Sequence, residues 1–189
     1  MTQKRETYPV EVAGLKRDLT LFEVSPGVRI AIVNILGDTE LVKAAALGLA
    51  DKLKPFDPEV LVTAEAKSIP LAYELSAVMN LPFVVLRKAY KPYMGDAVSA
   101  ETFSITTGQS QTLYLDEKDQ ALLTNRRVAL VDDVISTGST LQAMRLVTDK
   151  VHAKVVVEAA IFTEGDRAKW KSVVALGHLP VFLAGDKEG

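Results

Sequence analysis

Several residue types that many enzymes rely on are missing or rare in this chain of 189 residues. It has no cysteine, which excludes disulfides, thiolate zinc sites and thiol catalysis. Its two histidines, His152 and His178, leave little material for a histidine-rich metal site or a serine–histidine triad. No apolar run approaches the ~20 residues of a membrane span, and the opening MTQKRETYPV lacks the apolar stretch of a signal peptide. We therefore expect a cytoplasmic protein with no membrane partner.

An excess of charge of one sign is also missing. Lys and Arg number 22 against 24 Asp and Glu, which gives a formal net charge of -2. A protein that mainly neutralises nucleic-acid phosphates needs an excess of cations, so we expect no nucleic-acid partner. Hydrophobic residues make up 48% of the chain, which is ordinary for a globular protein. The length suits one domain whose core is stable without disulfides or structural metals.

Short apolar runs alternate with segments of helical spacing. The runs at 59–64, 82–86, 128–131 and 155–162 predict strands that are buried on both faces. Between them, residues 69–80 and the stripe of Leu141, Met144, Val147 and Val151 predict helices. Strand, helix and strand in this order are typical of a parallel sheet with helices on both sides. We therefore expect an α/β fold with a doubly wound, mostly parallel sheet.

Two regions fall outside this alternation. Strand-like segments at 8–12, 19–24 and 28–35 precede a helix predicted over 38–54, and we expect them to form a flap over one end of the sheet. Segments 101–107 and 111–115 predict a hairpin joined by Gly108, after an aperiodic stretch of the kind that forms functional loops. We expect a single domain over 1–189, made of the flap at 1–36, a core at 37–163 and a C-terminal extension at 164–189.

The segment VALVDDVISTGST at 128–140 carries the strongest chemical signal. It predicts a buried strand that ends at Asp132 and Asp133, then a loop of small residues and a helix start. Ligands of open α/β sheets bind beyond the carboxyl ends of the strands. The free N–H groups of the loop and the helix dipole suit a phosphate, which Gly138 lets approach closely. The two carboxylates would repel that phosphate, so they suit the hydroxyls of an attached sugar; the alternative is a plain helix cap with solvated acids.

This segment resembles the ribose-phosphate signature of type I phosphoribosyltransferases, which use phosphoribosyl pyrophosphate (PRPP). The resemblance covers about 60–162 and includes TAEAKS at 63–68 and LRK at 86–88, each at the end of a predicted strand. This order is similar to the adenine enzymes and to the archaeal-type purine enzymes related to them. The chain departs from them at Ser139, where the family has glycine, and at 28–34, which lacks the aromatic residue that sandwiches adenine.

The resemblance implies a role for each part of the site. Asp132 and Asp133 are the implied catalytic pair, which holds the ribose hydroxyls and binds Mg²⁺ indirectly through those hydroxyls or water. The implied ligands of the 5-phosphate are Ser136, Thr137, Gly138, Ser139 and Thr140. The implied ligands of pyrophosphate are Glu65, Ala66, Lys67, Ser68, Arg87, Lys88 and Lys91. The base is expected under the flap and at the end of the strand 155–162, against Val134, Ile161, Phe162 and Arg29.

The implied reaction is the Mg²⁺-dependent transfer of a phosphoribosyl group from PRPP to a purine, in purine salvage. Adenine is favoured, and the alternatives are a 6-oxopurine enzyme or a non-catalytic regulator that senses PRPP. Residues 1–58 show no helix-turn-helix pattern or cationic face, which argues against the regulator. The family also implies a homodimer and a mobile loop over about 90–108. Phe162 could equally be a core aromatic, and Trp170 is expected to serve packing or an interface.

Overall fold

A sheet of five parallel strands forms the centre of the computed structural model, which describes residues 5–104 and 109–184. The strand order is β10-β9-β8-β4-β5, and every neighbouring pair is parallel. β4 is buried along its whole length, as its apolar run predicts. The strands are β4 (Val60–Ala64), β5 (Phe83–Leu86), β8 (Arg127–Ile135), β9 (Lys154–Glu164) and β10 (Val174–Leu179).

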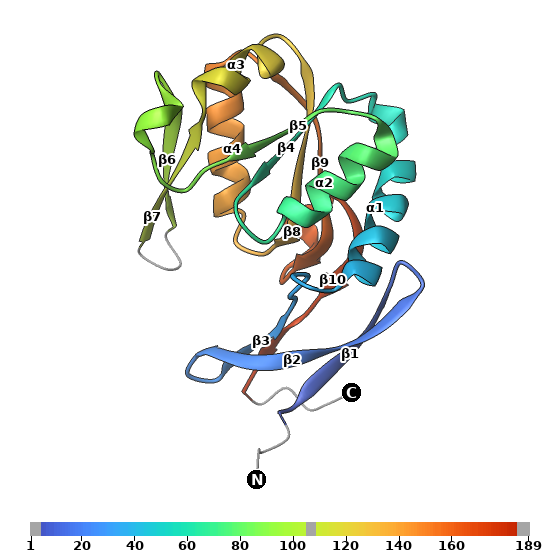
Figure 1. Cartoon of the computed structure of the whole chain (residues 1–189). Coiled ribbons are helices and arrows are strands. Elements are labelled where there is room, and N and C mark those ends of the chain that lie inside the picture. Colours follow the sequence, from blue (N-terminus) through green and yellow to red (C-terminus); the bar gives the residue numbers. More distant parts are fainter. Residues whose placement is uncertain (1–4, 105–108, 185–189) are drawn as a thin grey trace.

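Helices cover both faces of this sheet (Figure 1). α1 (Thr39–Leu53) and α2 (Ile69–Met79) bury their apolar stripes in one hydrophobic cluster, and α4 (Ser139–Lys150) lies in a second cluster on the other face. The α/β class and the doubly wound sheet are therefore confirmed. In the described part of the chain, no helix has the length and apolar character needed to cross a membrane.

A hairpin of β6 (Val98–Ser104) and β7 (Gln109–Leu115) packs beside α4. The Lys150 ammonium donates to the carbonyl of Ser99 at 2.6 Å, and the Thr102 hydroxyl lies 3.4 Å from the carbonyl of Ser139. The predicted hairpin is therefore present, while the expected turn at Gly108 lies outside the described residues. A short helix, α3 (Glu117–Leu123), follows β7 and is capped by Asp116.

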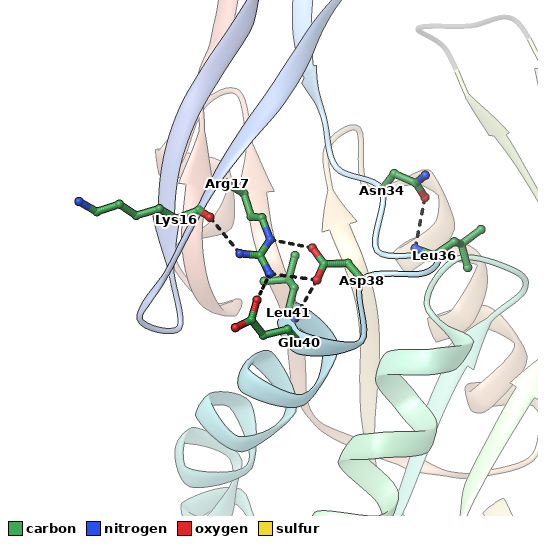
Figure 2. A network of polar contacts seen from close by, with 7 residues as sticks. All are labelled: Lys16, Arg17, Asn34, Leu36, Asp38, Glu40 and Leu41. Carbon is green, nitrogen blue, oxygen red and sulfur yellow. Dashed lines mark hydrogen bonds and ion pairs between the residues drawn. The ribbon is translucent and has the colours of Figure 1, made fainter.

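The flap is an antiparallel sheet of four strands at one end of the central sheet (Figure 1). It consists of β1 (Thr7–Val12), β2 (Leu15–Ser25), β3 (Val28–Ile32) and β11 (Val181–Leu183). Figure 2 shows how it is tied to α1: Arg17 on β2 donates to Asp38 at 2.7 and 3.0 Å and to Glu40 at 2.7 Å. Asp38 also accepts the N–H of Leu41 and so caps the helix. One carboxylate therefore starts the helix and anchors the flap.

Some strand boundaries differ from those that the sequence predicts. β8 and β9 run further than expected, and β3 is shorter. The predicted extension at 164–189 contributes β10 to the central sheet and β11 to the flap. β10 is half-buried at most positions, so its sequence lacks the continuous apolar run of a central strand. The division of the chain into flap, core and extension stays a prediction.

Candidate active site

The acid pair lies inside β8 rather than beyond its end. Asp132 pairs with Ala160 of β9, and the pairing continues to Ile135. Both Asp132 and Asp133 are buried. The prediction that the strand ends at these two residues is wrong here, because β9 extends to Glu164 and keeps β8 paired past the carboxylates. The two acids therefore lie in a low-dielectric setting that an open loop would not provide.

Ser68 joins the loop after β4 to the acid pair. Its buried hydroxyl donates to Asp132 Oδ1 at 2.5 Å and lies 3.4 Å from Asp133 Oδ1. The backbone N–H of Asp133 in turn lies 3.2 Å from the Ser68 oxygen and 2.9 Å from Asp132 Oδ1. Ser68 was predicted as a pyrophosphate ligand, but in this structure its hydroxyl is already engaged by the carboxylates.

The two carboxylates differ in their surroundings. Burial, together with the neighbouring charge of Asp133, raises the pKa of Asp132 to about 7, although the Ser68 hydroxyl acts in the opposite direction. Asp133 Oδ2 lies 3.1 Å from the Lys67 ammonium, but this ion pair lacks hydrogen-bond geometry, and among the described residues that buried oxygen has no hydrogen-bond partner. Asp133 therefore keeps one oxygen available for a ligand.

The small-residue loop connects the end of β8 to α4. Gly138 is the N-cap residue of α4 and has φ +81°, so it carries the left-handed backbone that the turn requires. Ser139 already belongs to the helix, which explains why a residue other than glycine is accepted there. Ser136 donates to Glu164 Oε1 at 2.5 Å, and the hydroxyls of Thr137 and Ser139 are 3.1 Å apart. The first turn of α4, which includes Thr140, starts with N–H groups that have no partner within the helix, and such a helix start suits an anion.

The loop after β4 is held by its own carboxylate. The peptide bond between Glu65 and Ala66 is cis. Glu65 accepts from Arg87 Nε at 2.6 Å and from the N–H of Lys88 at 2.6 Å. Burial alone would raise the pKa of Glu65, but these two donors outweigh it and lower the pKa. Arg87 is thus paired with Glu65, and Lys67 lies beside Asp133, so that Lys88 is the cation near the end of β5 that has no ion pair among the described residues. Lys91 lies further on, in an exposed segment.

These features match those of a known family. Residues 34–176 match the family model of the phosphoribosyl transferase domain. The chain belongs to this family. The match includes the acid pair, the small-residue loop and the loop after β4, and it excludes the flap strands β1, β2, β3 and β11.

Curated relatives of this phosphoribosyl transferase domain include a transcriptional repressor and enzymes that are named for different purine bases. The purine biosynthesis transcriptional repressor PurR of Bacillus subtilis is 28% identical over 132 residues, which cover 70% of this chain and 46% of the repressor. The hypoxanthine/guanine phosphoribosyltransferase of Ferroglobus placidus is 31% identical over 132 residues, 70% of this chain and 66% of that protein. The adenine phosphoribosyltransferase of Thermosipho africanus is 28% identical over 152 residues, 77% of this chain and 85% of that protein. The chain thus spans less than two thirds of the length of the first two relatives.

Solved structures of adenine phosphoribosyltransferases share the fold. The enzyme from Thermoanaerobacter pseudethanolicus aligns with a TM-score of 0.65 at 18% identity, over 92% of this chain and 95% of that chain. The enzyme from Trypanosoma brucei, in complex with AMP, pyrophosphate and ribose-5-phosphate, aligns with a TM-score of 0.64 at 24% identity, over 79% of this chain and 70% of that chain. At these identities the likeness establishes the architecture of the domain.

The expected base contacts of the phosphoribosyl transferase domain are not assembled as predicted. Ile161 and Phe162 are buried inside β9, where the ring of Phe162 lies against Gly177 of β10. The expectation that they emerge at a strand end is wrong, because β10 covers this part of β9. Val134 is half-buried, and Arg29 lies on the flap in an ion pair with Glu6 at 2.5 Å.

The structure also contains a cavity that sequence patterns did not indicate. It has a volume of about 620 Å³ and lies where the flap meets the segments after β9 and β10. Inside it, His178 is held by the hydroxyl of Thr163 at 2.9 Å and the carbonyl of Gly165 at 3.0 Å. Its lining residues are Tyr8, Gly165, Asp166, Arg167, His178, Pro180, Val181 and Leu183. The sequence could not indicate this cavity, because β10 and β11, which contribute part of its lining, were not predicted.

Magnesium fits the acid pair only as an ion that is shared with a ligand. No cluster of three or more potential metal-binding side chains exists among residues 5–104 and 109–184. Two oxygens on the neighbouring strands β8 and β4, Asp133 Oδ2 and Thr63 Oγ1, are buried and lack hydrogen-bond partners within this part of the chain. Oxygen donors suit Mg²⁺, which usually keeps several waters and binds through one or two carboxylates and substrate phosphates. Asp132 and Asp133 could hold it in this way.

Proposed function

We propose that the chain is a purine phosphoribosyltransferase that uses PRPP. One observation carries the proposal: a buried acid pair, in which Asp133 Oδ2 accepts no hydrogen bond from the described residues, is followed along the chain by a loop and a helix start whose first N–H groups suit a phosphate. In the reaction, the bond from ribose C1 to pyrophosphate breaks, and its electron pair leaves with pyrophosphate. A ring nitrogen of the base supplies the pair for the new C1–N bond, and its proton goes to water.

Asp132 and Asp133 act on the sugar in this proposal. Their oxygens accept hydrogen bonds from the 2- and 3-hydroxyls and place negative charge near the positive charge that develops on the ring. The residues from Ser136 to Thr140 bind the 5-phosphate and thereby hold C1 in line for attack. No nucleophile of the protein is needed, which agrees with the absence of cysteine.

The cations of the loop after β4 and of the end of β5 act on the leaving group. Lys67 and Lys88 attract pyrophosphate, while Glu65 holds Arg87 and the backbone of Lys88 in place. Asp132 and Asp133 would hold Mg²⁺, which would supply positive charge that stabilises the leaving pyrophosphate. The ligands named for the Trypanosoma brucei structure, AMP, pyrophosphate and ribose-5-phosphate, support the same ligand classes here.

The base is proposed to bind between the flap and the segments after β9 and β10. The cavity of about 620 Å³ has a size that is common for small-molecule sites. Adenine is favoured by the order of the sequence motifs and by a curated adenine relative of which this chain covers 85%. A 6-oxopurine is supported by relatives named hypoxanthine/guanine and xanthine phosphoribosyltransferases at 29–33% identity.

The Mg²⁺ requirement, a homodimer and a cytoplasmic location also belong to this proposal. They follow from the family, and the oxygen-rich acid pair supports the metal. A test by size-exclusion chromatography with light scattering would report the oligomeric state, and removal of Mg²⁺ by EDTA is expected to abolish turnover.

A second candidate function is that of a regulator that binds PRPP without catalysis. The similarity to PurR of Bacillus subtilis favours it, since the match reaches across 70% of this chain. The site chemistry described above would serve PRPP binding equally well without a base.

One assay separates these functions. The protein is incubated with PRPP and Mg²⁺ and with adenine, hypoxanthine, guanine or xanthine in turn, and nucleotide and pyrophosphate are measured. Nucleotide from one or more purines supports the enzyme, and the preferred base identifies the branch. PRPP binding in calorimetry without turnover of any base supports the regulator. Absence of both binding and turnover would contradict the proposal.

A further inference from the structure

The single tryptophan of the chain touches the small-residue loop at its glycine. A methyl group added to Gly138 would lie 2.7 Å from Cη2 and 3.3 Å from Cζ3 of the Trp170 indole. Separations this short mean that the ring is in direct contact with the loop backbone at Gly138. The contact occurs at the residue with φ +81°, where the chain turns into α4. The sequence alone suggested only a packing or interface role for Trp170.

Trp170 is fixed in this position by its own segment. It ends a short 3₁₀ turn, η3 (Arg167–Trp170), whose start is capped by the Asp166 carboxylate through the N–H of Ala168 at 2.9 Å. The indole N–H donates to the carbonyl of Glu164 at 2.9 Å. The ring is also partly buried against the hydrophobic cluster beneath α4. These contacts leave the indole little freedom to move away from the loop.

Glu164, the last residue of β9, holds the loop at a second point. Its carboxylate is buried and accepts the Ser136 hydroxyl at 2.5 Å, while its carbonyl accepts the Trp170 indole. One residue therefore supports the beginning of the loop directly and the middle of the loop through Trp170. Within the loop, the hydroxyls of Thr137 and Ser139 are 3.1 Å apart and Ser139 N lies 3.4 Å from Thr137 Oγ1, so neither of these contacts holds Gly138. The order of the loop therefore depends on these outside contacts.

We propose that Trp170 is a positioning residue for the small-residue loop. It holds Gly138 in the left-handed conformation before a ligand arrives, so the N–H groups of the loop already face the position of a phosphate monoester. Binding then requires less ordering of the loop, which strengthens affinity for the phosphate end of the substrate. The inference rests on the proposed function, because it assumes that this loop binds the 5-phosphate of PRPP.

The test measures binding of two probes by calorimetry on the full chain with Mg²⁺. Ribose 5-phosphate reports on the small-residue loop, and pyrophosphate reports on the loop after β4. We expect Trp170→Ala to raise the Kd of ribose 5-phosphate about tenfold or more through lost preorganisation, with the Kd of pyrophosphate unchanged. Trp170→Phe should restore most of the affinity, because a flat ring still fills the space beside Gly138.

Val173→Ala is the matched control, because Val173 follows in the same segment and packs against the same cluster. It should lower the melting temperature and leave both Kd values unchanged. In steady-state assays, Trp170→Ala should raise KM for PRPP more than it lowers kcat.

Different outcomes overturn different claims. Equal weakening of both probes, or no weakening of either, overturns the positioning role while the proposed function stands. A change confined to the KM of the base also overturns it, because Trp170 would then act on the base. If the unaltered protein binds neither ribose 5-phosphate nor PRPP, the proposed function itself is wrong.

Discussion

At the scale of single residues, Asp133 combines burial with an oxygen that has no hydrogen-bond partner among the described residues. That oxygen lies 3.1 Å from the ammonium of Lys67, whose side chain is about half exposed and can turn away when a ligand arrives. A buried acceptor without a partner costs free energy in the unliganded protein. Such a group is retained where a ligand uses it.

We predict that Asp133→Asn lowers kcat/KM for PRPP by roughly 100-fold or more, by analogy with the loss of one electrostatic group at a reaction centre. The stability should change little, because the amide has the same shape and the lost ion pair is weak. Turnover and the midpoint of urea unfolding measure the two effects. Parallel losses of activity and stability would contradict the placement of Asp133 at the sugar.

Asp132 gives a prediction about pH. Burial raises its pKa in the folded protein to about 7, whereas the unfolded value is about 3.9. Between these values the folded state binds more protons than the unfolded state, so this group makes the protein less stable as pH rises from about 4 to 7.

Asp132→Asn should remove that slope in the absence of Mg²⁺ and should leave the protein at pH 8 at least as stable as the unaltered chain. Urea unfolding at pH 5, 6, 7 and 8 measures it. If the variant shows the same slope as the unaltered chain, another group is responsible.

At the scale of elements, the parallel pair of β9 and β10 contains one very close approach, between Gly177 and Phe162. A methyl group on Gly177 would lie 2.6 Å from Cε1 and 2.8 Å from Cδ1 of Phe162. The ring is buried and cannot move aside without disturbing the core. Gly177 is therefore required by the approach of the two strands.

We predict that Gly177→Ala lowers the free energy of unfolding by about 1–3 kcal/mol through overpacking. Combining it with Phe162→Leu should recover part of the loss. Gly48→Ala in α1 is the control, since the added methyl meets only the flexible end of Leu176 and alanine favours the helix. Urea denaturation compares the variants, and equal stability of Gly177→Ala and the unaltered chain would refute the contact.

At the scale of the whole molecule, the flap shares a hydrophobic cluster with α1 and the central sheet and is also linked to α1 by polar contacts. Arg17 links β2 of the flap to Asp38 and Glu40 at the start of α1 (Figure 2). The Arg17 guanidinium, by its hydrogen bonds, lowers the pKa of Asp38. The stabilisation by this pair is thus present at neutral pH and is lost as pH falls below about 4.

We predict that Arg17→Ala loosens the flap without removing the cap that Asp38 gives α1. Amide hydrogen exchange should increase in β2 and β3 and stay unchanged in β4 and β8. KM for the base should rise while the Kd of PRPP stays the same, because the base is proposed to lie under the flap. Glu40→Ala, which removes only the exposed half of the contact, should have a smaller effect. Unchanged exchange in the flap would show that this link does not hold it.

The local pattern of the sequence predicted much of the core. The apolar runs and helical stripes predicted the strand–helix alternation. A segment that is buried on two faces, or along one stripe, has a characteristic spacing of apolar residues that can be read locally. The same holds for the acid pair and the Thr-Gly-Ser-Thr loop, whose chemistry is contained in neighbouring residues from Asp132 to Thr140.

Long-range contacts decided the rest. Asp132 is buried because β9 extends far enough to pair with it. Phe162 is a core residue because Gly177 of β10 packs against its ring. Glu164 and Trp170 meet the loop from a segment that carries no motif. The sequence by itself determined which groups could bind a sugar phosphate. Only the tertiary structure decided how those groups are buried, charged and held, because pairing between distant segments is set by packing and not by local periodicity.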